Sequence, residues 1–237
     1  MKVVFDYYHL NTRLKSADIV FNFHCRPKIK EMIDAKFYEG VDYAILKEDF
    51  YTVLPKREKY TDLCNVLLSF GTVDYSDITG RVLDSLLKYE SVDLILHIVL
   101  GSGYRHKDKI YELKKMREDR INIYEHIDSM AQLMAKMDIA FVGGGVTLFE
   151  AVQMNLPTLV VCAHPYGFEL AQNLVNRKCV INLGIHDDFD KDMVFESLDK
   201  LLLTEQFKNM KSNLEAFNIN GVDRISDILC SYSWVSV

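Results

Sequence analysis

Apolar runs and helical spacings alternate along the chain from about residue 64 to residue 183. Short, continuously apolar segments occur at 64–70, 94–100, 121–124, 139–142, 157–162 and 179–183. Between them, apolar residues recur at three- and four-residue spacing, which predicts helices at 78–87, 107–118, 128–136, 146–154 and 169–176. Strands that are apolar at every position are typical of a sheet whose two faces are both buried. The alternation therefore predicts an α/β fold, a Rossmann-like parallel sheet wound by helices.

The two ends of the chain follow different patterns. Residues 190–203, 205–217 and 222–231 have helical spacing. Residues 1–60 instead suggest short strands at 2–5, 18–22 and 43–46, with no clear helical period between them. A segment of this size is too small to close its own core. We therefore predict an N-terminal segment, 1–60, that packs on a main domain, 61–237, or on another chain.

The same N-terminal segment bears on assembly. Its apolar residues Val3, Phe5, Ile19 and Phe21 are expected to stay incompletely buried in a monomer. This predicts a homo-oligomer, or a partner chain that supplies the missing cover.

Composition narrows the classes of function. The chain has 28 Lys+Arg and 34 Asp+Glu, a net charge of −6, with no basic stripe that could neutralise nucleic-acid phosphates. No apolar run reaches the ~20 residues that span a bilayer, and the N-terminus lacks a signal-peptide pattern. We therefore expect a cytoplasmic protein without a membrane span. The five cysteines are widely spaced and form no C-x-x-C pair, so we expect neither a disulfide frame nor a zinc site. We also expect no other metal and no cofactor.

Glycines follow three of the predicted strands, at 69–74, 101–103 and 143–147. In an open parallel sheet, ligands bind beyond the carboxyl ends of the strands. Glycine lets a ligand approach the backbone, and a helix N-terminus offers unpaired amides to a diphosphate. The alternative is that these glycines only serve tight strand-to-helix turns.

Glu150 lies three residues after Thr147, in the first turns of the helix predicted at 146–154. A carboxylate at this depth can accept hydrogen bonds from both hydroxyls of a ribose. A solvated glutamate stabilised by the helix dipole is the other interpretation, and spacing alone does not separate the two.

The stretch 121–157, INIYEHIDSMAQLMAKMDIAFVGGGVTLFEAVQMNLP, resembles the UDP-binding C-terminal half of the GT-B superfamily. Segments 17–22, 43–50 and 68–74 are in turn similar to motifs of one family, the nucleotide-sugar hydrolase of pseudaminic acid biosynthesis. That family removes UDP from a diacetamido-trideoxy hexose. The peptidoglycan N-acetylglucosaminyltransferase is a more distant relative with the same domain. The resemblance implies that 61–237 is a UDP-sugar-binding domain and that 1–60 is the remnant of a first Rossmann domain.

The resemblance also implies roles for individual residues. Ile127 would hold the uracil edge through its backbone, with Met130 packed nearby, and Glu150 would take the ribose hydroxyls. The diphosphate would lie between two loops, contacting Gly71 and Thr72 on one side and Gly144, Gly145, Val146 and Thr147 on the other.

Two departures from the family pattern affect the expected function. The Asn-Gln pair that reads the sugar in relatives is absent from the stretch 162–169, where His164, Glu169 and Gln172 are the candidate sugar contacts. No segment matches the histidine motif of the family's N-terminal domain, so no catalytic residue is assigned. Three hypotheses follow: an enzyme of the hydrolase or glycosyltransferase type that releases UDP, a non-catalytic UDP-sugar-binding subunit, or a degenerate paralogue that needs a partner chain.

Overall fold

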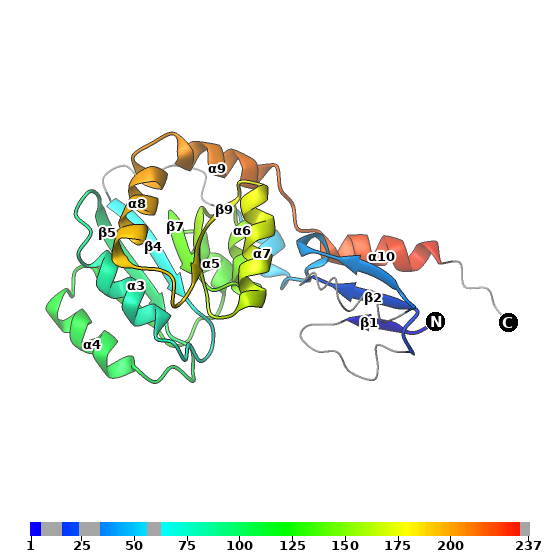
Figure 1. The fold of residues 1–237 in the computed structure, drawn as a ribbon, viewed down its shortest axis with the longest axis horizontal. Helices are drawn as coiled ribbons and strands as arrows, with labels where there is room; N and C mark the ends of the chain where they lie inside the picture. The colour runs from blue at the N-terminus through cyan, green and yellow to red at the C-terminus, as the bar shows by residue number, and fades with distance from the viewer. Residues whose placement is uncertain (6–15, 24–33, 56–62, 233–237) are drawn as a thin grey trace. The chain divides into compact units, whose positions relative to one another are not determined.

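A computed structural model describes residues 1–5, 16–23, 34–55 and 63–232 of the chain (Figure 1). The chain divides into two compact units. The smaller unit combines residues 1–47 with 218–237, and the larger comprises 48–217. The return of 218–237 to the N-terminal unit differs from the division expected from the sequence, which assigned these residues to the main domain.

The larger unit contains a six-stranded parallel sheet with the strand order β6-β5-β4-β7-β8-β9 (Figure 1). The strands are β4 (Leu63–Ser69), β5 (Asp93–Val99), β6 (Ile121–Tyr124), β7 (Ile139–Val142), β8 (Thr158–Cys162) and β9 (Val180–Ile185). Every residue of β7 and β8 is buried. The predicted α/β class and the strands of this sheet are confirmed.

Helices connect the strands and cover both faces of the sheet. They are α2 (Asp49–Thr52), α3 (Ile78–Leu86), α4 (Lys107–Met116), α5 (Met130–Met134), α6 (Val146–Gln153), α7 (Pro165–Asn176), α8 (Lys191–Leu202) and α9 (Gln206–Glu215). From β4 the chain moves toward β6, and from β7 it moves in the opposite direction toward β9. Because parallel crossovers are right-handed, α3 and α4 lie on one face and α6 and α7 on the other. The switch point falls between β4 and β7, where an open α/β sheet binds its ligands.

In the residues that the structure describes, the smaller unit is a three-stranded parallel sheet, β1-β2-β3, with helix α10 packed on it. Its elements are β1 (Val3–Phe5), β2 (Ile19–Asn22), β3 (Lys36–Glu39), the 3-10 helix η2 (Val41–Tyr43) and α10 (Gly221–Ser231). The strand predicted at 43–46 is wrong. The chain turns at Gly40, whose φ is 108°, and the Gly40 carbonyl then accepts the Tyr43 amide to form the 3-10 helix.

Helix α10 completes the core of the smaller unit. Ile225 packs with Ile19 and Phe21, each of which is only 1% exposed. The approach is close, because a Cβ added at Gly221 would lie 2.2 Å from the Ala44 carbonyl oxygen. The prediction that Ile19 and Phe21 are incompletely buried is therefore wrong, because α10, which is distant in the sequence, packs over them. Phe5 does remain 47% exposed.

Across the described parts of the chain, no helix is both long and apolar enough to cross a membrane.

Candidate functional site

The loops that follow β4 and β7 leave the sheet side by side. The two strands are paired in register, with Ser69 opposite Val142, and the Gly143 amide donates to the Ser69 carbonyl at 3.4 Å. The first loop carries Gly71 and Thr72, both exposed, and the second carries Gly144 and Gly145. The structure thus brings the two predicted diphosphate loops together at the switch point.

The glycines of the loop after β7 differ in what requires them. A Cβ on Gly144 would lie 2.6 Å from the backbone of Gly167 in the first turn of α7, so close packing demands glycine there. Added Cβ atoms on Gly143 and Gly145 would meet nothing within 4 Å, and neither residue has the positive φ that favours glycine. Neither packing nor backbone conformation therefore explains glycine at 143 and 145, and both positions are open to a ligand.

Helix α6 begins at this loop without a side-chain cap. Its N-cap is Gly145, which has no side chain to cap the helix, and its first turn holds no acidic residue. Val146 is exposed, while Thr147 and Glu150 are half-buried. A helix start without a capping carboxylate keeps its partial positive charge available to an anion.

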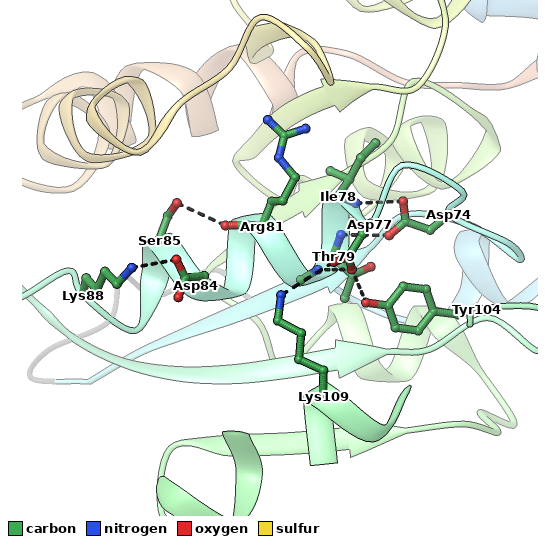
Figure 2. Close-up of polar contacts among 11 residues, drawn as sticks. Asp74, Asp77, Ile78, Thr79, Arg81, Asp84, Ser85, Lys88, Tyr104 and Lys109 are labelled. Carbon is green, nitrogen blue, oxygen red and sulfur yellow. Dashed lines mark hydrogen bonds and ion pairs between the residues drawn. The ribbon is translucent and has the colours of Figure 1, made fainter. Parts of the chain in front are cut away.

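Helix α3 follows the loop after β4, and unlike α6 its first amides are capped by carboxylates (Figure 2). The carboxylate of Asp74 accepts the amides of Ile78 and Thr79 at 2.9 and 2.8 Å, and Asp77 accepts the Gly80 amide at 3.2 Å. The expectation that both helix starts offer unpaired amides is therefore wrong for α3. If the loop after β4 contacts a phosphate, it must use its own residues Gly71 and Thr72.

A second loop supports this arrangement from the side. The Gly103 amide donates to the Thr72 carbonyl at 2.9 Å, and a Cβ on Gly101 would lie 2.2 Å from the same oxygen. The hydroxyl of Tyr104 donates to Asp77 at 2.5 Å, and Lys109 pairs with the other Asp77 oxygen at 3.7 Å (Figure 2). Burial and the neighbouring Asp77 raise the pKa of Tyr104 far above its usual range, so Tyr104 remains a neutral donor.

Replacing Asp74 with alanine is expected to lower the free energy of unfolding by about 1–2 kcal/mol, because two amides of α3 lose their acceptor. Chemical denaturation measures this loss. Asp84→Ala on the same helix is the matched control, since Asp84 makes an exposed ion pair with Lys88 and caps nothing. Equal stability of the two variants would show that Asp74 does not hold the start of α3.

The two residues predicted to lie at the uracil are in the loop between β6 and α5 and at the start of α5. Ile127 is half-buried in the loop, and Met130 is the first residue of α5. Ser129 caps this helix by accepting the Gln132 amide at 3.2 Å. A pocket of about 410 Å³ lies beside the loop and is lined by Asn65, His97, Tyr124, His126, Ile127, Asp128, Ser129, Gln132, Leu133, Lys136 and Met137.

His97 forms part of the floor of this pocket. Its two ring nitrogens lie 3.0 Å from the Tyr124 hydroxyl and 3.1 Å from the Asn65 side-chain oxygen, and Asn65 in turn donates to Asp138. Burial lowers the pKa of His97, so the ring is neutral and can donate to Asn65 while accepting from Tyr124. Both ring nitrogens of His97 are therefore used in structural hydrogen bonds.

Comparison with known proteins places this fold in a family. The model of the glycosyltransferase family 28 C-terminal domain matches residues 65–227. The chain belongs to this family. The match spans both glycine loops, the loop between β6 and α5, and most of α10.

Two curated proteins match most of this chain in sequence. The chain is 32% identical over 198 residues to an uncharacterized protein of Methanocaldococcus jannaschii, covering 79% of this chain and 38% of that protein. It is 24% identical over 181 residues to the spore coat polysaccharide biosynthesis protein SpsG of Bacillus subtilis, covering 75% and 52%. The chain therefore spans about half or less of the length of these relatives.

Solved structures share the fold at low sequence identity. MurG of Acinetobacter baumannii superposes with a TM-score of 0.66 at 13% identity, over 91% of this chain and 60% of that one. The spinosyn rhamnosyltransferase SpnG, solved in complex with thymidine diphosphate, has a TM-score of 0.57 at 16% identity, over 90% and 57%. Both are GT-B glycosyltransferase folds.

The candidate sugar contacts of the family 28 domain all belong to α7 or its cap. His164 is the exposed N-cap, Glu169 is exposed, and Gln172 is half-buried. The tight contact between Gly167 and Gly144 joins this helix to the glycine loop. Nearby, burial raises the pKa of Cys162 to about 12, so this thiol is protonated and unsuited to act as a nucleophile.

Proposed function

We propose that the family 28 domain of this chain binds a UDP-sugar at the switch point between β4 and β7. The diphosphate would lie on the start of α6, the ribose on Glu150 and the uracil on the backbone of Ile127. The observation that carries the proposal is the uncapped, glycine-lined start of α6 beside an α3 whose start is already filled by carboxylates.

The contrast between the two helices supports placing the phosphates at the start of α6. A diphosphate is repelled by Asp74 and Asp77, which hold the start of α3, and attracted to the amides of Val146 and Thr147. Gly143 and Gly145 leave room for close approach at that point. Gly71 and Thr72 would then enclose the phosphates from the exposed loop opposite.

The ribose position follows from the geometry of α6. Glu150 lies four residues after Val146, about one helical turn along the same face. A carboxylate one turn from the phosphate amides can accept both ribose hydroxyls while staying clear of the phosphates. Half-burial of Glu150 strengthens such hydrogen bonds relative to those of a fully solvated side chain.

The proposed reaction is release of UDP from an amino-sugar donor in the biosynthesis of a surface glycan or a nonulosonic acid. Amides on the leaving diphosphate would stabilise the negative charge that develops as the glycosidic bond breaks. The resemblance to the pseudaminic acid hydrolase favours water as the acceptor, and the relation to SpsG favours a role in polysaccharide biosynthesis. The thymidine diphosphate complex of SpnG is a precedent for a nucleoside diphosphate on this fold.

Calorimetric titration of the protein with UDP, UMP and uridine tests the proposal. We expect affinity to fall in that order, because each lost phosphate removes contacts with α6. Binding of uridine as tight as that of UDP would disprove the phosphate site, and absence of UDP binding would disprove the whole proposal. Incubation with UDP-sugars, followed by assay of free UDP, then tests the reaction, with His164→Ala and Gln172→Ala probing the sugar contacts.

A further inference from the structure

We infer that Asp49 is a positioning residue for the loop that presents Ile127 to the nucleobase, and that it acts through Ser129. The inference rests on the proposed function. Asp49 belongs to the segment 43–50, which resembles the hydrolase family but has no role in the site described above.

Helix α2 lies where it can influence both sides of the nucleotide site. Although only four residues long, it contacts α5 and α6, the helices that follow the uracil loop and the glycine loop. Phe50, which is 2% exposed, anchors it in the core of the larger unit. The side chain of Asp49 is therefore held by a fixed element and not by a mobile surface turn.

Two hydrogen bonds connect the start of α5 to Asp49, and in each of them the donor lies on the α5 side. The Ser129 hydroxyl donates to Asp49 Oδ2 at 2.6 Å, and the Ser129 oxygen accepts the Gln132 amide at 3.2 Å. A serine hydroxyl has a single hydrogen, so donation to Asp49 sets its rotation and leaves a lone pair for the helix. Ser129 is two residues from Ile127, so Asp49 fixes the end of the loop whose backbone would contact the base.

The environment of Asp49 favours a role beyond stability. Its second oxygen, Oδ1, is buried and accepts no hydrogen bond from any described residue. A buried carboxylate oxygen without a partner destabilises the fold, and an alanine at this position would avoid that cost. The orientation that Asp49 imposes on Ser129 explains why a carboxylate is present at this position despite its cost in stability.

The test compares UDP affinity and melting temperature among variants of the full chain. Asp49→Ala and Ser129→Ala should each weaken UDP binding about tenfold, because a loop whose end is no longer fixed holds Ile127 less well against the base. Asp49→Asn should restore most of the affinity, because its amide oxygen can still accept from Ser129. Glu48→Ala is the matched control, since this exposed neighbour makes no side-chain capping bond.

Two readouts separate positioning from a structural role. The preference for UDP over CDP should fall in Asp49→Ala but stay unchanged in Glu48→Ala, because a displaced loop reads the base less well. The double variant Asp49→Ala, Ser129→Ala should bind no more weakly than Ser129→Ala alone. If Asp49→Ala does not fold, Ser129→Ala, which leaves α2 intact, gives the same base-preference test.

The outcomes distinguish this inference from the proposed function. If the unmodified protein binds UDP and both alanine variants keep its affinity and base preference, Asp49 has no positioning role and the proposed function stands. Loss of affinity that Asp49→Asn does not restore also overturns the inference. If the unmodified protein does not bind UDP, the proposed function itself has failed.

Discussion

Replacing Glu150 with glutamine is expected to lower the affinity for UDP by roughly 10–150-fold. The carboxylate would accept hydrogen bonds from both ribose hydroxyls, and hydrogen bonds to a charged group contribute about 1.5–3 kcal/mol. Glutamine keeps the length of the side chain and the helix propensity but has only one accepting oxygen. Because glutamine has the same shape as the half-buried Glu150 of α6, the change should leave the fold intact. Titration calorimetry measures the loss of affinity.

The ribose assignment can be separated from a general charge effect with a modified ligand. The unmodified protein should bind 2′-deoxy-UDP more weakly than UDP, whereas Glu150→Gln should discriminate much less between the two. Glu112→Gln, on the exposed face of α4, removes the same charge elsewhere and should keep the full discrimination. If Glu150→Gln prefers UDP over 2′-deoxy-UDP as strongly as the unmodified protein does, Glu150 does not hold the ribose.

The strands of the larger unit could be predicted because their sequences are apolar without interruption. β7 and β8 lie in the middle of the sheet, are buried on both faces, and were located to within one residue. Helix α7 was predicted four residues too late. Pro165 begins it, and its first turn is exposed, so the apolar spacing that marks a helix appears only at Leu170. The local sequence pattern therefore located the buried strands, but it missed the first turn of α7, which packs through the backbone of Gly167.

The parts of the site that escaped prediction depend on residues far apart in the sequence. Asp49 and Ser129 are separated by 80 positions, and no periodicity links them. The return of α10 to the smaller unit likewise depends on Ile225 meeting Ile19 and Phe21. By contrast, the caps on α3 had a local signal, since Asp77 directly precedes Ile78 and Asp74 lies four residues before it. The expectation of unpaired amides at α3 did not take that signal into account.

Two neighbouring glycines of the loop after β7 are expected to respond differently to alanine. Gly144→Ala should lower the free energy of unfolding by about 1–3 kcal/mol, because its Cβ would lie 2.6 Å from the backbone of Gly167, which cannot rotate away. Gly145→Ala meets nothing within 4 Å and has an extended backbone, so its entropic gain offsets the poorer N-cap and stability should change by less than about 1 kcal/mol. Chemical denaturation of the two variants measures the difference.

Although Gly145→Ala should leave the protein folded, it should weaken the binding of UDP. In Gly145→Ala the added methyl group stands at the uncapped start of α6, where the diphosphate would approach the amides of Val146 and Thr147. We therefore expect a folded protein that binds UDP at least about tenfold more weakly, with uridine binding unaffected, since steric exclusion there concerns the phosphates alone. A Gly145→Ala variant with undiminished UDP affinity would mean that the glycine has no part in nucleotide binding, and that the phosphates, if bound, lie elsewhere along the switch point.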